Sequence, residues 1–366
     1  MRRCVTILVA VLLAVAASPA PAEAEGTDPS WATCSQQTVP VTLSATDPVV
    51  YNVVGRLCLR DDGSRGAHTV ELFVSGLTYD HNYFNLGYQP NTYSYVYAAT
   101  SRGYSTFNID RLGVGLSDHP PADKLTLQSH AYVLGQVVQK LRAGAVGGRA
   151  FTIVAGVGHS FGAATLQYLA GTATDATTVP DYLVLASFLM TTYAPGLTAL
   201  GSALYPASSD PAFAAAGLSA GYLTTLPGTR ASIFYRTAGA ESGMPAVDEA
   251  MKQTGTLTER STLAAARNTA VTLAVKVPVL ITVGQYDNLY CSEASGLTCA
   301  TAAAVRTREA TNWGPRACLS TYVVADGGHV TGLHIKARDS YNFAHSWLDR
   351  YSIPGAVAKD ANGCLP

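Results

Sequence analysis

Short apolar runs, separated by longer amphipathic stretches, follow one another along most of the chain. Six compact runs, each ending in small or polar residues, lie at 69–75, 104–110, 151–156, 182–187, 279–283 and 321–325. Two earlier runs, 38–44 and 49–60, are rich in Val, Thr and Tyr. Runs of this kind are typical of strands, and the compact ones suit strands that are buried on both faces of a parallel sheet.

Helical periodicity fills the intervals between these runs. Residues 127–141 place Leu, Ala and Val at helical spacing, and Gly144 can end that helix. Residues 164–170 and 337–351 predict two further helices. Strands and helices that alternate in this way predict an α/β fold with a doubly wound, mostly parallel sheet.

One segment interrupts this alternation. About ninety residues, rich in Ala, Gly, Leu and Thr and broken by prolines, separate the run that ends at Ser187 from the run that begins at Val279. We interpret residues 188–266 as a mostly helical insertion. Residues 25–187 and 267–366 then form the α/β core.

The first residues have the pattern of a targeting segment. Arg2 and Arg3 precede an apolar run, residues 5–17, that is short for a membrane span. A small-x-small site follows and predicts a signal peptide, residues 1–24, cleaved after Ala24. The general export route is favoured over the twin-arginine route, and an uncleaved anchor is the alternative.

Six cysteines remain after that cleavage, and an even number in an exported chain indicates disulfides. Fifteen connectivities are open, and near neighbours are the preferred partners. The expected pairs are Cys34–Cys58, Cys291–Cys299 and Cys318–Cys364. A metal site is disfavoured because no C-x-x-C or H-x-x-x-H spacing occurs.

Composition narrows the choice of partner. The 366 residues are 48% hydrophobic and 13% charged, and the formal net charge is −1. Neither a polyanion partner nor nucleic acid is indicated by this balance. No later segment is apolar enough for stable membrane insertion. No cofactor or metal is expected, and the oligomeric state stays open.

The strongest chemical signal is the sequence Gly-His-Ser-Phe-Gly at 158–162, between a predicted strand and a predicted helix. This is the setting of a G-x-S-x-G nucleophile turn, in which a sharp bend lifts the serine above the end of the strand. Ser160 is therefore the candidate nucleophile. A serine in an ordinary Gly-rich turn is the alternative.

A nucleophilic serine needs a base and an orienting acid, in the chain order Ser, Asp or Glu, His. Asp287 and His329 each follow a predicted strand, on loops at the carboxyl edge of the sheet. His334 is a rival base, expected instead to bond or pack near the next helix. Asp326 lies too close to its strand to be the preferred acid, and Asp110 is the reserve acid.

Two backbone amides are expected to stabilise the oxyanion. One belongs to Phe161, which follows the nucleophile, and the other to Leu77 in the loop after residues 69–75. Tyr79, His81 and His159 are candidate substrate-binding residues, with loop packing as the alternative role. The Gly-rich loop 110–117 matches no phosphate-binding pattern and is interpreted as structural.

Together these motifs resemble the α/β-hydrolase superfamily, and particularly its cap-bearing esterase and lipase-like branch. The resemblance covers about residues 45–350 and is carried by segments 75–85, 110–118, 158–162, 284–289 and 327–329. It implies a cap inserted after the sixth strand. Ser75-Gly76 stands where many relatives have His-Gly, but a backbone donor at Leu77 does not depend on that side chain.

The resemblance implies a serine hydrolase that cleaves carboxylic esters of small to medium hydrophobic substrates. The predicted signal peptide implies a secreted protein, and the preference for Arg over Lys together with the richness in Ala fits a bacterial, extracellular one. Apolar residues of the insertion would line its pocket or pack as core: Phe188, Leu189, Met190, Tyr193, Leu197, Leu200, Leu204, Tyr205, Tyr222 and Leu223.

Several alternatives remain open. The same chemistry would serve a lactonase, a thioesterase or acyltransferase, or a proline-iminopeptidase-like peptidase. The peptidase would need Glu241, Asp248 or Glu249 to bind a free amine. An inactive binding protein on this fold is the alternative outside enzymes.

Overall fold

The computed structural model describes residues 26–61, 68–353, 355 and 357–365. The predicted signal peptide lies outside these residues. Within the described part of the chain, no helix combines the length and the apolarity that a membrane span requires.

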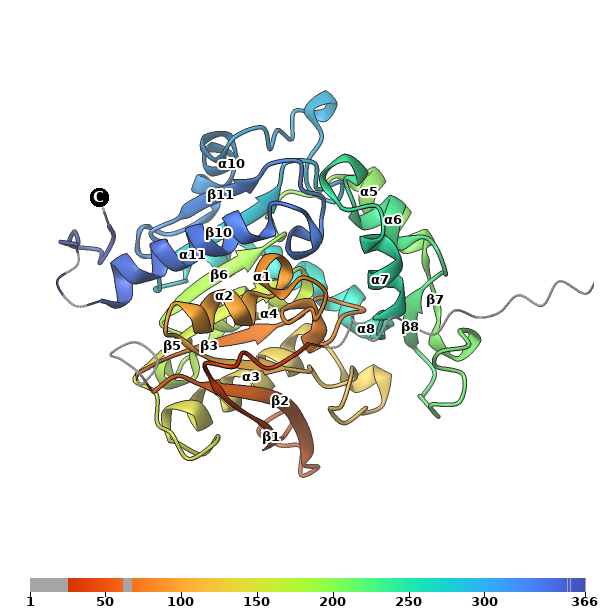
Figure 1. The fold of residues 1–366 in the computed structure, drawn as a ribbon, viewed down its shortest axis with the longest axis horizontal. Coiled ribbons are helices and arrows are strands. Elements are labelled where there is room, and N and C mark those ends of the chain that lie inside the picture. The colour runs from red at the N-terminus through yellow and green to blue at the C-terminus, as the bar shows by residue number, and fades with distance from the viewer. Residues whose placement is uncertain (1–25, 62–67, 354, 356, 366) are drawn as a thin grey trace, which may run out of the picture.

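Eight strands form one sheet in the order β1-β2-β4-β3-β5-β6-β10-β11 (Figure 1). They are β1 (Thr33–Val41), β2 (Tyr51–Leu59), β3 (Thr69–Val74), β4 (Ser105–Ile109), β5 (Ile153–His159), β6 (Tyr182–Ala186), β10 (Val279–Gly284) and β11 (Ser320–Val324). The pairs β1–β2 and β2–β4 are antiparallel, and all the other pairs are parallel. The predicted α/β fold with a mostly parallel sheet is confirmed.

The six compact apolar runs become the six strands from β3 to β11 of this sheet, and β3 and β10 are buried along their whole length. The edge strand β1 differs from the prediction, because it begins at Thr33 rather than at Thr38. Its first residues are polar and mostly exposed, so they carry no apolar signal. Backbone pairing with β2 makes them a strand.

Helices cover both faces of the sheet (Figure 1). Those of the core are α1 (Pro90–Tyr93), α2 (Tyr95–Ser101), α3 (Leu127–Arg142), α4 (Phe161–Thr172), α9 (Thr269–Leu273), α10 (Ala302–Glu309) and α11 (Ala337–Ser352). Leu72 and Val74 of β3 pack into the apolar cluster that contains α3 and α4. Phe73 points to the other face, into the cluster with α2 and α11. Alternate side chains of one strand therefore serve two cores.

The segment between β6 and β10 contains both helices and a small sheet. Its elements before α9 include α5 (Ala194–Ser202), β7 (Leu204–Pro206), β8 (Tyr222–Thr225), α6 (Arg230–Phe234), α7 (Met244–Ala250), β9 (Gly255–Thr256) and α8 (Leu257–Thr262). Strands β7, β8 and β9 form a separate antiparallel sheet that the sequence did not predict, because strands of two to four residues are too short to show a period. Figure 1 shows this segment gathered at one end of the main sheet.

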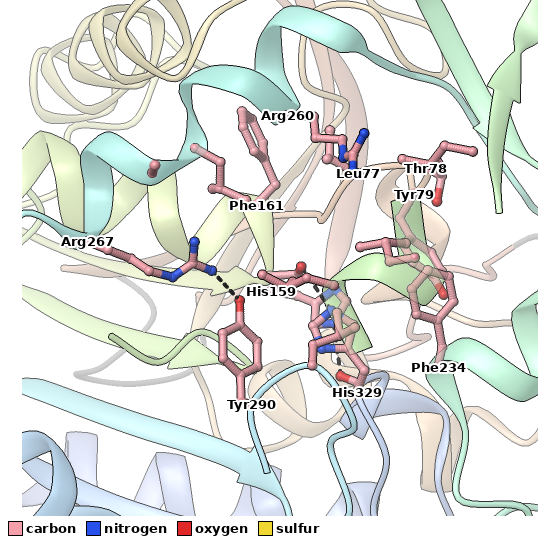
Figure 2. A pocket seen from close by; sticks show the side chains of 17 residues that line it. Leu77, Thr78, Tyr79, His159, Phe161, Phe234, Arg260, Arg267, Tyr290 and His329 are labelled. Carbon is pink, nitrogen blue, oxygen red and sulfur yellow. Dashed lines mark hydrogen bonds between the residues drawn. The ribbon is translucent and has the colours of Figure 1, made fainter. Parts of the chain in front are cut away.

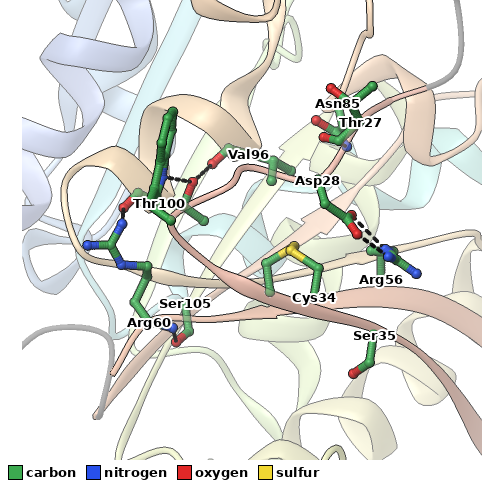
Figure 3. Close-up of a disulfide and its surroundings, with 12 residues drawn as sticks. Thr27, Asp28, Cys34, Ser35, Arg56, Arg60, Asn85, Val96, Thr100 and Ser105 are labelled. Atoms are coloured by element: carbon green, nitrogen blue, oxygen red, sulfur yellow. Dashed lines mark hydrogen bonds and ion pairs between the residues drawn. A yellow bond between two sulfur atoms is a disulfide. The ribbon is translucent and has the colours of Figure 1, made fainter. Parts of the chain in front are cut away.

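The three disulfides join the three cysteine pairs expected from the sequence. Cys34 and Cys58 lie directly opposite each other on β1 and β2 (Figure 3). The disulfide between Cys318 and Cys364 holds the C-terminal tail near the start of β11.

Candidate active site

Ser160 occupies a strained turn between β5 and α4. Its φ and ψ angles are 50° and −112°, in a region that residues other than glycine rarely adopt. Gly158 and Gly162 permit the turn, because a Cβ atom would lie 2.5 Å from the Ala163 amide nitrogen at the first and 2.0 Å from the Val74 carbonyl oxygen at the second. The Ser160 side chain is thereby presented at the carboxyl edge of the sheet.

The structure brings Ser160, His329 and Asp287 together in one hydrogen-bonded row. Ser160 Oγ lies 2.9 Å from His329 Nε2, and His329 Nδ1 lies 3.1 and 3.0 Å from the two Asp287 carboxylate oxygens. Asp287 and His329 are almost completely buried. The Leu289 amide donates to Asp287 Oδ1 at 3.1 Å and helps to orient the carboxylate. This arrangement can activate a serine hydroxyl.

A disulfide closes the loop that carries the acid. The Cys291 amide donates to the Asp287 carbonyl oxygen at 2.7 Å, and Cys291 is bonded to Cys299. The chain that leaves β10 is therefore tied down within a few residues of the carboxylate.

The rival base and acids have other positions. His334 accepts from the Gly328 and Arg236 amides at 2.9 and 3.2 Å, and its Nδ1 lies 2.8 Å from the Val330 carbonyl oxygen. Burial lowers its pKa, so the neutral ring shapes the loop around His329. Asp326 is exposed at the end of β11, and Asp110 bonds His81.

The amides of Leu77 and Phe161 are free of protein acceptors within the described residues, and both residues line the pocket that contains Ser160. Phe161 begins α4, where the first amides of a helix have no partner inside the helix. The two amides are thus available to a substrate oxygen.

Arg111 holds the loop of Leu77 from one side. Its Nε and Nη2 donate to the carbonyl oxygens of Ser75 and Gly76 at 2.9 and 3.0 Å, and its Nη1 bonds Glu259 of α8. Burial alone would raise the pKa of Glu259, but the charge of Arg111 and the nearby His130 outweigh it and lower that pKa to about 2. The loop 110–117 thus has the structural role predicted for it.

Arg230 holds the same loop from the other side, which no local pattern in the sequence indicates. It donates to Thr78 Oγ1 at 3.0 Å and to Asp248 Oδ1 at 2.8 Å, and Arg230 and Asp248 are fully buried. Asp248 also accepts the Tyr79 hydroxyl at 3.1 Å. Thr78 has a positive φ of 61°, which these bonds help to maintain.

A cavity of about 240 Å³ opens above Ser160 (Figure 2). Core residues that line it are Leu77, Thr78, Tyr79, His159, Ser160, Phe161, Leu289, Tyr290 and His329. Residues between β6 and β10 that line it are Leu197, Leu200, Leu204, Phe234, Arg260, Leu263, Ala264 and Arg267. The cavity is small for a ligand site, and its walls are mostly apolar.

Two of the three candidate substrate-binding residues lie at this cavity. Tyr79 lines it, although its hydroxyl is bonded to Asp248. His159 also lines it and is stacked on Tyr83 with ring centroids 4.1 Å apart. Burial, followed by the proximity of His329, lowers the pKa of His159 well below its usual value. His81 is not among the lining residues, and its ring lies 2.8 Å from Asp110.

The apolar residues of the insertion divide between pocket and core. Leu197, Leu200 and Leu204 line the pocket, whereas Phe188, Leu189 and Tyr222 are buried in the core. Phe234, Tyr290 and the two arginines also line the cavity, although they were not expected from the sequence. The arginines, seven residues apart with Leu263 between them, were the one available signal, because that spacing repeats on a helix face.

Two groups of potential metal ligands exist among the described residues, and neither has free ligand atoms. Asp28 lies beside Cys34 and Cys58, whose sulfurs form a disulfide. Asp80 and Asp110 accept protein hydrogen bonds at both of their carboxylate oxygens. We assign no metal to either group.

A family model described as "Alpha/beta hydrolase family" matches residues 72–339. A search of curated protein sequences finds no significant match.

Solved structures share the fold. A thermophilic esterase from Thermogutta terrifontis has a TM-score of 0.58 and 16% identity over 86% of this chain and 98% of its own. A soluble variant of a monoglyceride lipase from Saccharomyces cerevisiae has a TM-score of 0.57 and 12% sequence identity, over 91% of this chain and 99% of its own. An enol-lactonase from Burkholderia xenovorans LB400 has a TM-score of 0.50 and 15% sequence identity, over 81% of this chain and 96% of its own.

Proposed function

The chain belongs to the alpha/beta hydrolase family, and we propose that it is a serine hydrolase of carboxylic esters with Ser160 as nucleophile, His329 as base and Asp287 as orienting acid. The observation that carries the proposal is the 2.9 Å contact between Ser160 Oγ and His329 Nε2, backed by the contact of His329 Nδ1 with both Asp287 oxygens. Ester cleavage is preferred because the pocket beside this row is small and mostly apolar.

The proposed mechanism has two half-reactions. His329 Nε2 takes the Ser160 proton while Oγ attacks the ester carbonyl carbon, and the Leu77 and Phe161 amides donate to the resulting oxyanion. The proton then passes from His329 to the departing alcohol. In the second half, His329 takes a proton from water, which attacks the acyl-enzyme, and returns it to Ser160. Asp287 keeps the imidazole oriented and stabilises its positive charge.

Residues 188–266 serve as the cap in this proposal. Leu197, Leu200 and Phe234 line the cavity beside Ser160 and would contact the acyl group of the substrate. Tyr79 shapes the pocket rather than binds polar groups of the substrate, because its hydroxyl donates to Asp248. The Nε2 atom of His159 lies 3.2 Å from the His329 carbonyl oxygen, whereas its buried Nδ1 atom has no hydrogen-bond partner among the described residues.

The peptidase alternative has less support. Glu241 bonds Tyr88 and Tyr93, Asp248 bonds Arg230, and Glu249 bonds Lys252. None of these three carboxylates lines the cavity, so none is placed to bind the free amine of a peptide.

Export is part of the proposal, and the three disulfides support it because such bonds persist in oxidising compartments. Protein collected outside the cells should begin at Glu25 by N-terminal sequencing. A mature protein that still begins at Met1 would contradict cleavage after Ala24.

The test of the function uses a fluorophosphonate probe and p-nitrophenyl esters. The wild-type protein should be labelled and should hydrolyse the esters, and Ser160→Ala should abolish both activities. Ser346→Ala is the matched control, since it removes an exposed hydroxyl on α11. A folded wild-type protein that takes no label would refute the assignment of Ser160 and favour a binding protein.

A further inference from the structure

Two arginines line the cavity above Ser160, and no carboxylate does. Arg260 comes from α8, and Arg267 ends the short 3-10 helix that follows it. Figure 2 shows both among the lining side chains, with Arg267 directed at Tyr290. The lining residues include no Asp or Glu, so the wall of an apolar pocket carries two cations without an acidic neighbour on that wall.

Of the two arginines, Arg260 has fewer hydrogen bonds to the protein. Within the described part of the chain its guanidinium has no hydrogen bond or ion pair, whereas Arg111 and Arg230 are each bonded to a buried carboxylate. Its head group lies against α5, because a Cβ atom at Gly201 would be 2.3 Å from Arg260 Nη2. The missing side chain at Gly201 leaves the space that this guanidinium occupies.

Arg267 is fixed in place but not neutralised. Its Nη2 donates to the Tyr290 hydroxyl at 2.9 Å, its Nε donates to the Leu189 carbonyl oxygen at 3.2 Å, and its guanidinium lies 4.5 Å from the centre of the Phe188 ring. Burial raises the pKa of Tyr290 to about 12, so this hydroxyl brings no negative charge. Glu309, a nearby acid, accepts the Met190 amide at 3.1 Å instead.

Arg267 is partly buried, and Arg260 is exposed where it lines the cavity. A partly buried cation such as Arg267 is costly without a counter-charge, and a guanidinium matches a carboxylate with two parallel hydrogen bonds. A carboxylate on the bound ligand would supply the negative charge that the cavity wall lacks. The acyl part of an ester becomes bonded to Ser160 in the first half-reaction and is released in the second. It therefore occupies the cavity during both, and it is the part that these arginines would contact.

Resting on the proposed ester hydrolysis, we propose that the acyl group of the substrate ends in a free carboxylate, which Arg260 and Arg267 bind. The substrate is then a half-ester of a short dicarboxylic acid. Leu197, Leu200 and Leu263 would contact its methylene groups.

Two p-nitrophenyl esters of similar size test the proposal: the half-ester of glutaric acid, which is anionic, and the pentanoate ester, which is neutral. The wild-type protein should have the higher kcat/KM on the half-ester. Arg260→Gln and Arg267→Gln should each lower the ratio of anionic to neutral kcat/KM by about tenfold. Arg316→Gln, an exposed arginine outside the pocket, removes the same charge and should leave the ratio unchanged.

A second variant guards against misfolding. Gly201→Ala adds one methyl group on α5, where alanine favours the helix, and it displaces only the flexible end of Arg260. It should keep the wild-type melting temperature and still lower the ratio. A ratio that stays constant in both Arg260→Gln and Gly201→Ala would overturn the role of Arg260.

A binding measurement separates this inference from the proposed function. Calorimetry should show glutarate binding to the Ser160→Ala protein, pentanoate binding more weakly, and glutarate affinity falling when Arg260→Gln is added. If the wild-type protein hydrolyses both esters equally and no glutarate binds, the inference fails and the hydrolase stands. If neither ester is cleaved and the probe does not label Ser160, the proposed hydrolase function fails. In that case glutarate binding would still support the carboxylate site, and its absence would overturn that site.

Discussion

The two sides of the catalytic pocket are built in different ways. On the core side, Ser160, Asp287 and His329 follow β5, β10 and β11, and hydrogen bonds join their side chains. On the insertion side, which here means the segment between β6 and β10, leucines and two arginines line the same cavity. Neither arginine is paired with a carboxylate within the described part of the chain. The core side carries the hydrogen-bonded row, and the insertion side carries apolar and positively charged side chains of the cavity wall.

Two buried ion pairs join the sides. Arg111 reaches Glu259 of the insertion, and Arg230 and Asp248, both of the insertion, reach Thr78 and Tyr79 of the core loop. Both pairs converge on the loop that holds the Leu77 amide. The arginines that fix the loop are bonded to carboxylates, whereas within the described residues those that face the cavity are not. This difference is the basis of the ligand-binding role proposed for the second kind.

The largest effect should come from the core side. Asp287→Asn keeps the size of the side chain but removes the charge that orients His329, so kcat should fall by about 10⁴-fold with little change in melting temperature. Steady-state kinetics on a p-nitrophenyl ester measures the loss. Asp326→Asn, at the exposed end of β11, should leave kcat unchanged, and a comparable loss there would argue against Asp287 as the acid.

Breaking a pair that joins the two sides should affect stability next. Arg230→Met leaves Asp248 buried without its cation, and the free energy of unfolding should fall by about 3–5 kcal/mol. Urea denaturation measures it. Lys336→Met breaks an exposed ion pair with Asp339 and should cost less than about 1 kcal/mol; equal costs would show that Arg230 holds nothing in place.

The ion pair between Arg111 and Glu259 predicts a pH dependence of stability. The pKa of Glu259 is lowered to about 2 in the fold, below its unfolded value. The ionised carboxylate therefore stabilises the fold above the unfolded pKa, and this contribution disappears as the pH falls toward 2. Glu259→Gln should lose about 3 kcal/mol of unfolding free energy at pH 7.

Urea denaturation from pH 7 downward tests this dependence. The difference between wild type and Glu259→Gln should shrink steadily below about pH 4.5. Asp339→Asn, an exposed acid on α11, provides the control and should give a small difference at every pH. A gap between wild type and Glu259→Gln that is constant with pH would contradict the shifted pKa.

The smallest effect concerns the insertion side. A cavity of about 240 Å³ favours short acyl chains, so kcat/KM on neutral p-nitrophenyl esters should fall by about tenfold or more between butanoate and dodecanoate. Leu200→Ala should move the preference toward longer chains. Leu257→Ala, an exposed leucine of the insertion that does not line the cavity, should leave the profile unaltered.

Local sequence determined most of the fold and of the catalytic row. Apolar runs mark buried strands, Gly158 and Gly162 permit the turn at Ser160, and Asp287 and His329 follow strands whose ends meet at one edge of the sheet. Each of these signals depends on neighbours along the chain or on the fixed order of a parallel sheet. His329, rather than His334, has its Nε2 atom 2.9 Å from Ser160 Oγ, whereas His334 accepts the Gly328 amide.

Only the tertiary structure decided what surrounds that row. The starting point of β1, the small sheet β7-β8-β9 and the placement of His81 away from the cavity depend on pairings between distant segments. The roles of the arginines do so as well, since an arginine has the same local pattern whether or not a carboxylate meets it. Charge pairing across the fold is a long-range property, and it separates Arg230, which stabilises the loop, from Arg260, which faces the cavity.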